Sequence, residues 1–164
     1  MIIFGASGDL TKRKLMPALY TLYKDGRLPD DFAILGIGRT EYEDDNYRAY
    51  ILKELEQFIA PKEQVTEKMT DFCKHLNYLT MNPADVEEYV RLNDRLQELT
   101  GEKEPDNLLF YLATPPSLYG VIPLHLKATH LNRPHSRIIV EKPFGYDLES
   151  ARILNRIYSS VFEE

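Results

Sequence analysis

The residues best suited to chemistry lie near the start of the chain, where the apolar stretch 2–4 runs into Gly-Ala-Ser-Gly-Asp-Leu at residues 5–10. Gly5 permits a tight turn between a strand and a helix, and Gly8 lets an anion approach the main chain. The helix that follows such a turn supplies free N–H groups and the positive end of its dipole. This segment therefore predicts a phosphate site built from backbone.

The glycine spacing does not decide the matter alone, because the usual dinucleotide fingerprint has three glycines and any tight strand–helix turn can have two. Lys12, Arg13 and Lys14 lie beside the turn and would make it locally positive. Asp9 either caps the helix or turns its carboxylate away from a bound phosphate, toward these cations. The local charge therefore suits an anionic ligand.

Arg39 is the most informative side chain after the turn, because it ends the apolar segment 32–38, which predicts a strand. In NAD-binding versions of this arrangement the second strand ends in Asp or Glu, which accepts hydrogen bonds from the ribose 2′-hydroxyl. A guanidinium cannot accept a hydrogen bond, but it pairs well with a 2′-phosphate. Arg39 therefore favours NADP over NAD, although Glu41 could lessen the discrimination and exposed arginines at strand ends are common.

Two later segments end in residues that could also meet a ligand. Ala113 closes the segment 107–113, and its small side chain leaves room for a dinucleotide against the backbone. Lys142 stands just past the segment 136–141, at the strand edge where ligands bind in open α/β sheets. Pro143 favours an extended conformation for Lys142, and the sequence does not decide whether the bond between them is cis.

Strand and helix patterns alternate along the chain, which is typical of a parallel sheet with helices on both faces. The predicted strands are 2–5, 32–37, 76–81, 107–113 and 136–141. The predicted helices are 9–25, 44–59, 62–75, 84–100, 116–131 and 147–162. The fold class is therefore α/β, a Rossmann-like doubly wound parallel sheet in a three-layer α/β/α arrangement.

Residue types also predict three local features of these elements. The short apolar segment 137–140 reads as a strand buried on both faces. Pro17 removes a helical hydrogen bond and should bend or divide the first helix near Leu15. Gly26 and Gly101 stand where helix C-caps belong.

Length and composition limit the remaining possibilities. The chain has 164 residues, 43% of them apolar, and a net charge of -6, which suits one domain over 1–164 and argues against nucleic acid as a partner. No apolar run approaches the ~20 residues of a membrane helix, so no membrane contact is expected. The single Cys73 predicts a buried thiol in a reducing cytoplasm. The four histidines lack metal-ligand spacing, so no metal is expected.

Four segments together resemble the glucose-6-phosphate dehydrogenase family, specifically its N-terminal coenzyme domain. They are the turn and the residues after it (5–15), the second-strand end Gly-Ile-Gly-Arg (36–39), Leu-Ala-Thr-Pro-Pro-Ser-Leu-Tyr (112–119) and Glu-Lys-Pro-Phe-Gly (141–145). These segments occur in the family's order and span essentially the whole chain. Their combination is far more specific than any one of them.

The resemblance implies an NADP-binding domain from an enzyme that oxidises D-glucose 6-phosphate to 6-phosphogluconolactone, the entry step of the pentose phosphate pathway. In similar proteins the lysine that matches Lys142 lies between substrate and nicotinamide, so the resemblance makes Lys142 the candidate catalytic and substrate-binding residue. The implied cofactor contacts are Gly5, Ala6, Ser7, Gly8, Asp9, Leu10, Lys14, Arg39, Ala113, Thr114, Pro116, Tyr119 and Lys142.

The family's sugar-phosphate contacts and its general-base histidine belong to later segments, around Arg-Ile-Asp-His-Tyr-Leu-Gly-Lys-Glu and beyond. None of the four histidines here has that context. We therefore expect the catalytic C-terminal domain to be absent from this chain, and the fragment to be inactive and monomeric, whereas the parent enzyme is expected to be a homo-oligomer. Two alternatives stay open: a domain of the glucose–fructose oxidoreductase type, whose turn normally has three glycines, and a non-catalytic NADP-sensing module.

Overall fold

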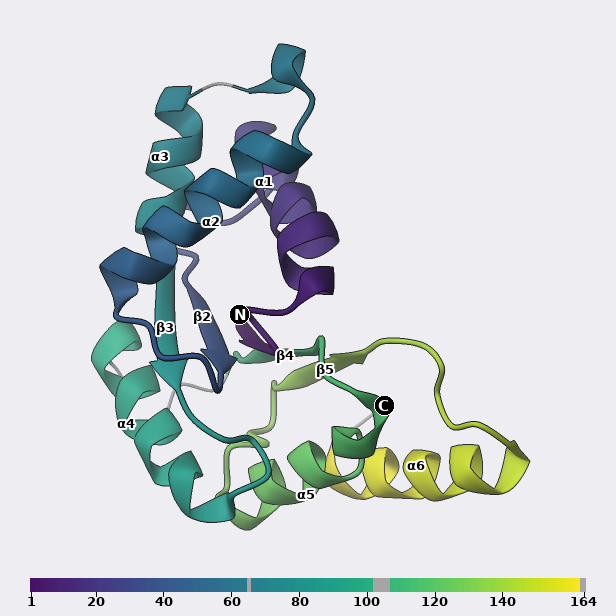
Figure 1. Ribbon diagram of the computed structural model, residues 1–164. Helices are drawn as coiled ribbons and strands as arrows, with labels where there is room; N and C mark the ends of the chain where they lie inside the picture. Colours follow the sequence, from purple (N-terminus) through teal and green to yellow (C-terminus); the bar gives the residue numbers. More distant parts are fainter. Residues whose placement is uncertain (65, 102–106, 163–164) are drawn as a thin grey trace.

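In the computed structural model, which describes residues 1–64, 66–101 and 107–162, five short strands pair in parallel in the order β3-β2-β1-β4-β5 (Figure 1). The central strand is β1, where Ile3 lies opposite Gly36 of β2 on one side and Tyr111 of β4 on the other. Each strand overlaps its predicted range. The bounds are β1 Ile2–Phe4, β2 Ile34–Gly38, β3 Leu76–Thr80, β4 Leu109–Leu112 and β5 Arg137–Val140.

The helices alternate with the strands as the sequence predicted. Helices α1 to α6 span Met16–Lys24, Asp44–Phe58, Thr66–Lys74, Tyr89–Thr100, Val121–Ala128 and Leu148–Val161. Short turns precede several of them: the π-helical turn η1 (Thr11–Leu15) and the 3-10 turns η2 (Pro61–Glu63), η3 (Val86–Glu88) and η4 (Pro116–Leu118). Position 65, inside the predicted helix 62–75, lies outside the described residues. None of the described helices is long and apolar enough to cross a membrane.

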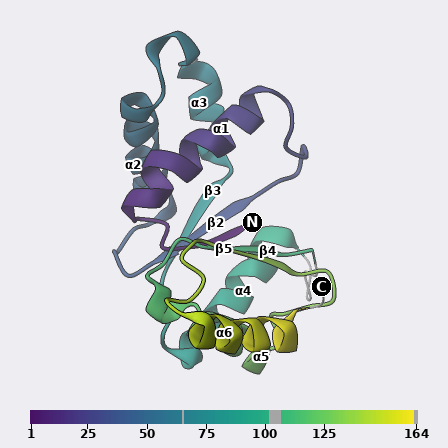
Figure 2. The same ribbon diagram turned by 90° about the vertical axis from the view of Figure 1, so that its right-hand side faces the viewer.

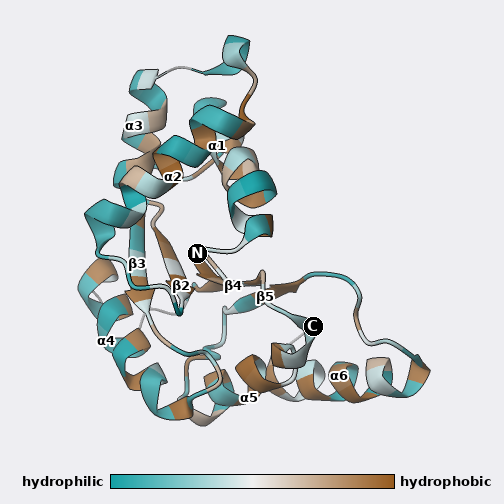
Figure 3. Ribbon diagram, viewed as in Figure 1, coloured by the Kyte–Doolittle hydropathy of each residue, from teal (hydrophilic) through white to brown (hydrophobic). Residues whose placement is uncertain are grey.

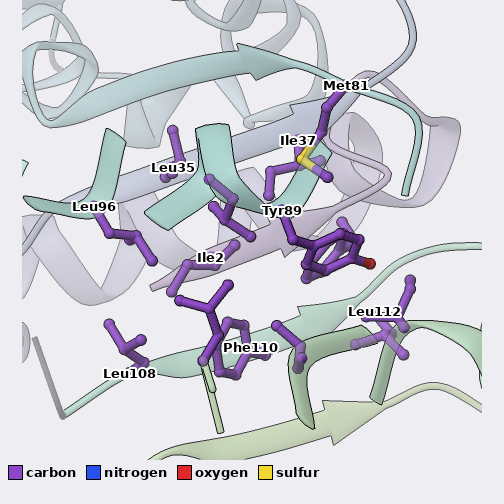
Figure 4. Packing of buried hydrophobic residues seen from close by; sticks show 14 of the residues in the cluster. Ile2, Leu35, Ile37, Met81, Tyr89, Leu96, Leu108, Phe110 and Leu112 are labelled. Atoms are coloured by element: carbon purple, nitrogen blue, oxygen red, sulfur yellow. The ribbon is translucent and has the colours of Figure 1, made fainter. Parts of the chain in front are cut away.

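The sheet lies between two layers of helices (Figure 2). Helices α1, α2 and α3 cover β1 to β3 on one face, where Tyr20, Tyr47 and Phe72 are fully buried. Helices α4 and α5, with α6 packed against α5, cover the other face, where Tyr89 and Phe110 lie in the core (Figure 4). The central strands β1 and β2 are apolar, whereas the helices carry both hydrophilic and hydrophobic residues (Figure 3). This arrangement confirms the predicted three-layer α/β/α fold.

The prediction that the last strand is buried on both faces is wrong. Alternate residues of β5 are exposed, and the side chain of Ile139 is 42% exposed. The reason is that β5 pairs only with β4 within the described sheet, and the layer of α1 to α3 lies over β1 to β3. An apolar run cannot tell which face of its strand a helix will cover.

The first helix is divided where Pro17 led us to expect it. Residues Thr11–Leu15 form a π-helical turn, and the Met16 N–H donates to the Thr11 carbonyl five residues earlier. Pro17 has no N–H to donate, so the regular hydrogen-bond ladder cannot run through this point. The wider turn takes up one additional residue before α1 begins. The expected helix ends at Gly26 and Gly101 are also confirmed, since both adopt positive φ angles just after α1 and α4.

Because helices cover the sheet unevenly, shortening a strand side chain should reduce the free energy of unfolding by different amounts at different positions. Leu112→Ala, at a site with no exposed surface, should lower the free energy of unfolding by about 2–5 kcal/mol, because it leaves a cavity in the core. Ile139→Ala, on the uncovered face of β5, should cost at most about 1 kcal/mol. Urea unfolding of both variants measures the difference. Equal losses would show that the face carrying Ile139 is covered in solution.

Candidate functional site

The sheet brings most of the predicted site residues to one edge. The strands are parallel, so their carboxyl ends share that edge. The glycine turn follows β1, the central strand, Arg39 follows β2 on one side, and Ala113 follows β4 on the other. Lys142 lies one strand further along, beyond β5. Residues more than a hundred positions apart in sequence thus surround one turn, as the sequence predicted.

The glycine turn is held from below by a set of hydrogen bonds. The N–H groups of Gly5 and Ala6 both donate to the Ile37 carbonyl, each at 2.9 Å. The Gly5 carbonyl accepts from the Gly8 N–H and from the Thr11 hydroxyl, each at 3.0 Å. These bonds tie the turn to the end of β2 and to the first turn of the helix.

The orientation of the carbonyls decides what the turn can bind. The Gly5 oxygen points toward Thr11, and the Ala6 oxygen accepts a hydrogen bond from the Tyr47 hydroxyl at 3.1 Å. Both oxygens are therefore engaged by the protein. The amides that open a helix have no partner inside that helix, and here they follow directly after Gly8. The turn consequently presents N–H donors rather than carbonyl acceptors, which is the arrangement that binds an anion.

Gly5 is required by packing as well as by conformation. Its φ is +86°, in the region that side chains disfavour, and a Cβ there would lie 2.3 Å from the Ala113 carbonyl oxygen. Ala113 therefore serves the turn through its backbone, which lies directly against Gly5. A Cβ at Gly8 would lie 3.0 Å from the Gly5 carbonyl oxygen, so glycine at position 8 also keeps the turn tight.

The Asp9 carboxylate lies near the cations that follow the turn, which is one of the two roles that the sequence predicted for it. The Asp9 carboxylate lies 4.0 Å from the Lys12 ammonium and 3.5 Å from the Arg13 guanidinium. Among the described residues no backbone N–H donates to the Asp9 carboxylate, so the capping role considered for Asp9 is not observed. Lys12 also lies 3.8 Å from Glu54, whereas Lys14 is exposed and forms no ion pair with any residue that the structure describes.

Arg39 lines an open cavity of about 580 Å³ at the ends of β2 and β3. Its wall also includes Tyr42 and Met81, and Arg91 comes from α4. Tyr42 is fixed by a neighbouring tyrosine edge on to it, with 5.4 Å between the ring centroids. A cation beside aromatic and apolar walls suits a flat heterocycle that bears a phosphate. Three carboxylates also line this cavity and are part of the environment of any such ligand: Glu41, Glu43 and Glu88.

The ends of β4 and β5 contribute polar groups on the other side of the turn. The Thr114 hydroxyl is buried and has no hydrogen-bond partner among the described residues. The Tyr111 hydroxyl donates to the Glu141 carboxylate, and burial together with this carboxylate raises the pKa of Tyr111 to about 12. Tyr111 therefore stays protonated at neutral pH and holds Glu141 beside Lys142, whose side chain is exposed.

The loop after β5 turns into α6. The bond between Lys142 and Pro143 is cis. Gly145 lies so close to α6 that a Cβ there would be 2.6 Å from the Ala151 nitrogen. Asp147 caps α6: its carboxylate accepts from the Ser150 hydroxyl and from the Ser150 N–H, each at 2.7 Å, and these two bonds lower the pKa of Asp147. The loop that carries Lys142 is thus anchored at its far end.

Pro116 and Tyr119 differ in their exposure to solvent. Pro116 is exposed at the start of η4, whereas the Tyr119 side chain is only 2% exposed and belongs to the core. Burial raises the pKa of Tyr119, with a smaller effect from Glu141. A contact between Tyr119 and a cofactor stays a prediction.

Sequence reasoning missed the side chains that hold the turn in place. Thr11 is fully buried, and its position directly after the Asp-Leu pair of the turn was a usable signal. Tyr47 lies on α2, 41 residues beyond the carbonyl that it binds, and nothing in the local pattern marks it. Glu141 opens the Glu-Lys-Pro-Phe-Gly segment, but nothing in the sequence marks Tyr111 as its partner.

The histidines lie away from this edge. His75 and His135 precede β3 and β5, so they lie at the amino ends of their strands, on the far side of the sheet. His125 is in α5, where its ring meets Tyr89 edge on, with 5.3 Å between the ring centroids. His130 follows the C-terminal end of α5, where the chain leads to the amino end of β5. Within the described part of the chain there is no group of three or more His, Cys, Asp or Glu residues that could hold a metal.

Comparisons with known proteins find relatives that match essentially the whole chain. The family model described as "Glucose-6-phosphate dehydrogenase, NAD binding domain" matches residues 2–164. The glucose-6-phosphate 1-dehydrogenases of Aggregatibacter actinomycetemcomitans and Schizosaccharomyces pombe are 48% and 35% identical to the whole chain, which covers 33% of each relative. The chain thus spans about a third of the length of these relatives.

Solved structures give the same result for the fold. The crystal structure of glucose-6-phosphate 1-dehydrogenase from Mycobacterium avium superposes with a TM-score of 0.83 at 31% identity, over 99% of this chain and 33% of that one. A glucose-6-phosphate dehydrogenase in complex with glucose 6-phosphate superposes with a TM-score of 0.82 at 33% identity, over 99% of this chain and 34% of that one.

The packing of the turn predicts that Gly5 tolerates a side chain much less well than another glycine of similar φ. Gly26 has φ +66° and nothing within 4 Å of an added Cβ, so Gly26→Ala should cost only the conformational strain, about 1–2 kcal/mol. Gly5→Ala adds a clash with the Ala113 carbonyl and should cost about 3 kcal/mol or more. Thermal unfolding of the pair measures this, and equal losses would mean that the turn is not pressed against β4.

Proposed function

Because the chain belongs to the glucose-6-phosphate dehydrogenase family, as its NAD-binding domain, we propose that it binds NADP through the glycine turn and Arg39. The observation that carries this proposal is the orientation of the turn. Its carbonyls at positions 5 and 6 accept hydrogen bonds from the protein, so its remaining amides are available to a pyrophosphate.

Arg39 supports the choice of NADP over NAD. It is exposed at the end of β2 and lines the cavity at the ends of β2 and β3, where a dinucleotide would place its adenosine ribose. A guanidinium forms charge-assisted hydrogen bonds with a 2′-phosphate but can accept none from a 2′-hydroxyl. The carboxylates that line the same cavity repel a phosphate and therefore reduce the preference; they belong to Glu41, Glu43 and Glu88.

Residues at the end of β4 and just after the glycine turn are also suited to a bound dinucleotide. The buried Thr114 hydroxyl has no partner among the described residues, and a ligand lying across the end of β4 could provide one. Asp9 is held by Lys12 and Arg13, which keeps its charge directed away from a phosphate at the turn. We propose the remaining contacts at Leu10, Lys14, Pro116 and Tyr119 on the family resemblance.

We further propose that this domain serves a glucose-6-phosphate dehydrogenase, acting at the entry of the pentose phosphate pathway. When bound, NADP⁺ supplies the hydride acceptor. Lys142, exposed beyond β5 and backed by the Tyr111–Glu141 pair, is the side chain proposed to bind and orient the sugar phosphate. A cationic ammonium at that point suits the oxygens of an anionic sugar.

The first test of this proposal concerns cofactor choice. NADP⁺ should bind about 10- to 100-fold more tightly than NAD⁺, because a hydrogen bond to a charged group contributes roughly 1.5–3 kcal/mol. Arg39→Ala should remove most of this preference by weakening NADP⁺ binding alone. Arg137→Ala is the matched control, since Arg137 is an exposed strand arginine at the opposite edge of the sheet.

Titration calorimetry with both cofactors measures these affinities. An Arg39→Ala variant that keeps the wild-type preference would overturn the role of Arg39, while binding of neither cofactor to the wild-type chain would overturn the proposed function itself.

The placement of the histidines gives a second expectation. None of the four lies at the carboxyl edge beside Lys142, so this chain has no imidazole base there. A general base contributes about 10²–10⁴-fold to such a reaction. The chain mixed with NADP⁺ and glucose 6-phosphate should therefore produce no detectable NADPH, as followed by NADPH fluorescence. Formation of NADPH at ordinary enzymatic rates would show that the catalytic groups lie elsewhere in this chain.

A further inference from the structure

A buried tyrosine lies directly beneath the glycine turn. Tyr47, on α2, has no exposed surface, and its hydroxyl donates to the Ala6 carbonyl at 3.1 Å. The strand opposite leaves room for it: a Cβ at Gly36 would lie 3.0 Å from the Tyr47 oxygen and 2.8 Å from the Ala6 Cβ. Glycine at position 36 therefore lets the tyrosine hydroxyl reach the turn.

This hydrogen bond sets the orientation of one peptide group. A trans peptide is planar, and its C=O and N–H point in opposite directions. The Ala6 carbonyl points down to Tyr47, so the N–H of the same peptide, which belongs to Ser7, points up and away from the core. Ser7 is partly exposed while Ala6 is fully buried, in agreement with this orientation.

The opposite orientation of the same peptide would harm an anion site. It would direct the Ala6 oxygen toward the space above the turn and turn the Ser7 N–H inward. A carbonyl facing a phosphate is repulsive, and one N–H donor would be lost. The Tyr47 hydroxyl favours the productive orientation because it offers the carbonyl a partner only on the buried side.

The tyrosine is suited to this task over the whole physiological pH range. Burial, with further contributions from Tyr78, Tyr50 and Tyr42, raises the pKa of Tyr47 well above its usual value. The hydroxyl therefore remains protonated and donates. Its ring lies 4.5 Å from that of Tyr78 and 5.9 Å from that of Tyr42, measured between centroids, so the side chain is held on several sides.

We propose that Tyr47 is a positioning residue for the dinucleotide, which fixes the Ala6–Ser7 peptide so that the Ser7 N–H faces the pyrophosphate. The proposal rests on the proposed function, because it assigns Tyr47 a role at the same turn. It extends the site to a residue on α2 that touches no cofactor and acts through the backbone. Gly36 belongs to the same device, since it provides the space for the hydroxyl.

Tyr47→Phe tests the proposal in the full 164-residue chain, because it removes the hydroxyl and keeps the ring. The matched control is Tyr89→Phe: Tyr89 is also fully buried, and its hydroxyl donates to the Pro83 carbonyl at 2.9 Å, in the other core. Both variants should lose similar stability in thermal unfolding. Only Tyr47→Phe should weaken NADP⁺ binding, by about tenfold, the effect expected when one charge-assisted hydrogen bond is disturbed.

Two further measurements distinguish a positioning role of Tyr47 from general destabilisation of the fold. NAD⁺ binding should weaken by the same factor as NADP⁺ binding, since both carry the pyrophosphate, so the preference governed by Arg39 stays unchanged. The ³¹P resonances of the bound pyrophosphate should shift in Tyr47→Phe, while the 2′-phosphate resonance keeps its wild-type position. Tyr89→Phe should leave all three resonances unchanged.

Unchanged affinity and unchanged pyrophosphate resonances in a folded Tyr47→Phe variant would overturn the proposal. Equal loss of affinity in Tyr47→Phe and Tyr89→Phe would also overturn it, because the effect would then follow stability alone. If Tyr47→Phe does not fold, Gly36→Ala provides the second variant, since its Cβ displaces the hydroxyl while the tyrosine stays. Gly36→Ala should show the same selective shift of the pyrophosphate resonances, and wild-type resonances in that variant would again contradict the role. A wild-type chain that binds neither cofactor would instead refute the proposed function.

Discussion

The structure depends on one carbonyl at the end of the second strand. The Ile37 oxygen accepts the N–H groups of both Gly5 and Ala6, and so binds the turn after β1 to the end of β2. Gly5 can lie this close to the end of β2 only because it has no side chain: the Ala113 backbone fills the space that a Cβ would need. The ends of three neighbouring strands, β1, β2 and β4, therefore meet at one glycine.

Most of the fold could be predicted because its signals are local. Alternating apolar and amphipathic segments placed each strand and helix, and Pro17 located the division of the first helix. The error at β5 has a physical cause. The apolar residues of 138–140 report how hydrophobic the strand is, but whether Ile139 is covered depends on where α1 to α3 lie, which no local pattern records.

In the candidate site, too, some residues are marked by local sequence signals and others are not. Gly5, Gly8 and Arg39 could be proposed from the sequence because their chemistry is visible in their own type and in their place after a strand. Thr11 and Tyr47 could not, because they act on the backbone of other residues, and a carbonyl that needs a donor leaves no mark in the sequence. The same holds for Tyr111, whose partner lies 30 residues away on the neighbouring strand. Side chains that support a turn are thus harder to predict than the turn itself.

The π-helical turn between the glycine turn and α1 has a consequence for how this segment can evolve. Thr11 and Met16 are both fully buried, yet they stand five residues apart instead of the three or four that would align them on a regular helix. The widened turn resets the helical phase, so that Thr11 faces the Gly5 carbonyl while Met16 and Tyr20 face the sheet. Loss of a single residue here would leave the glycines and α1 intact but misaligned by about 100°. The length of this segment is therefore under constraint separately from its composition.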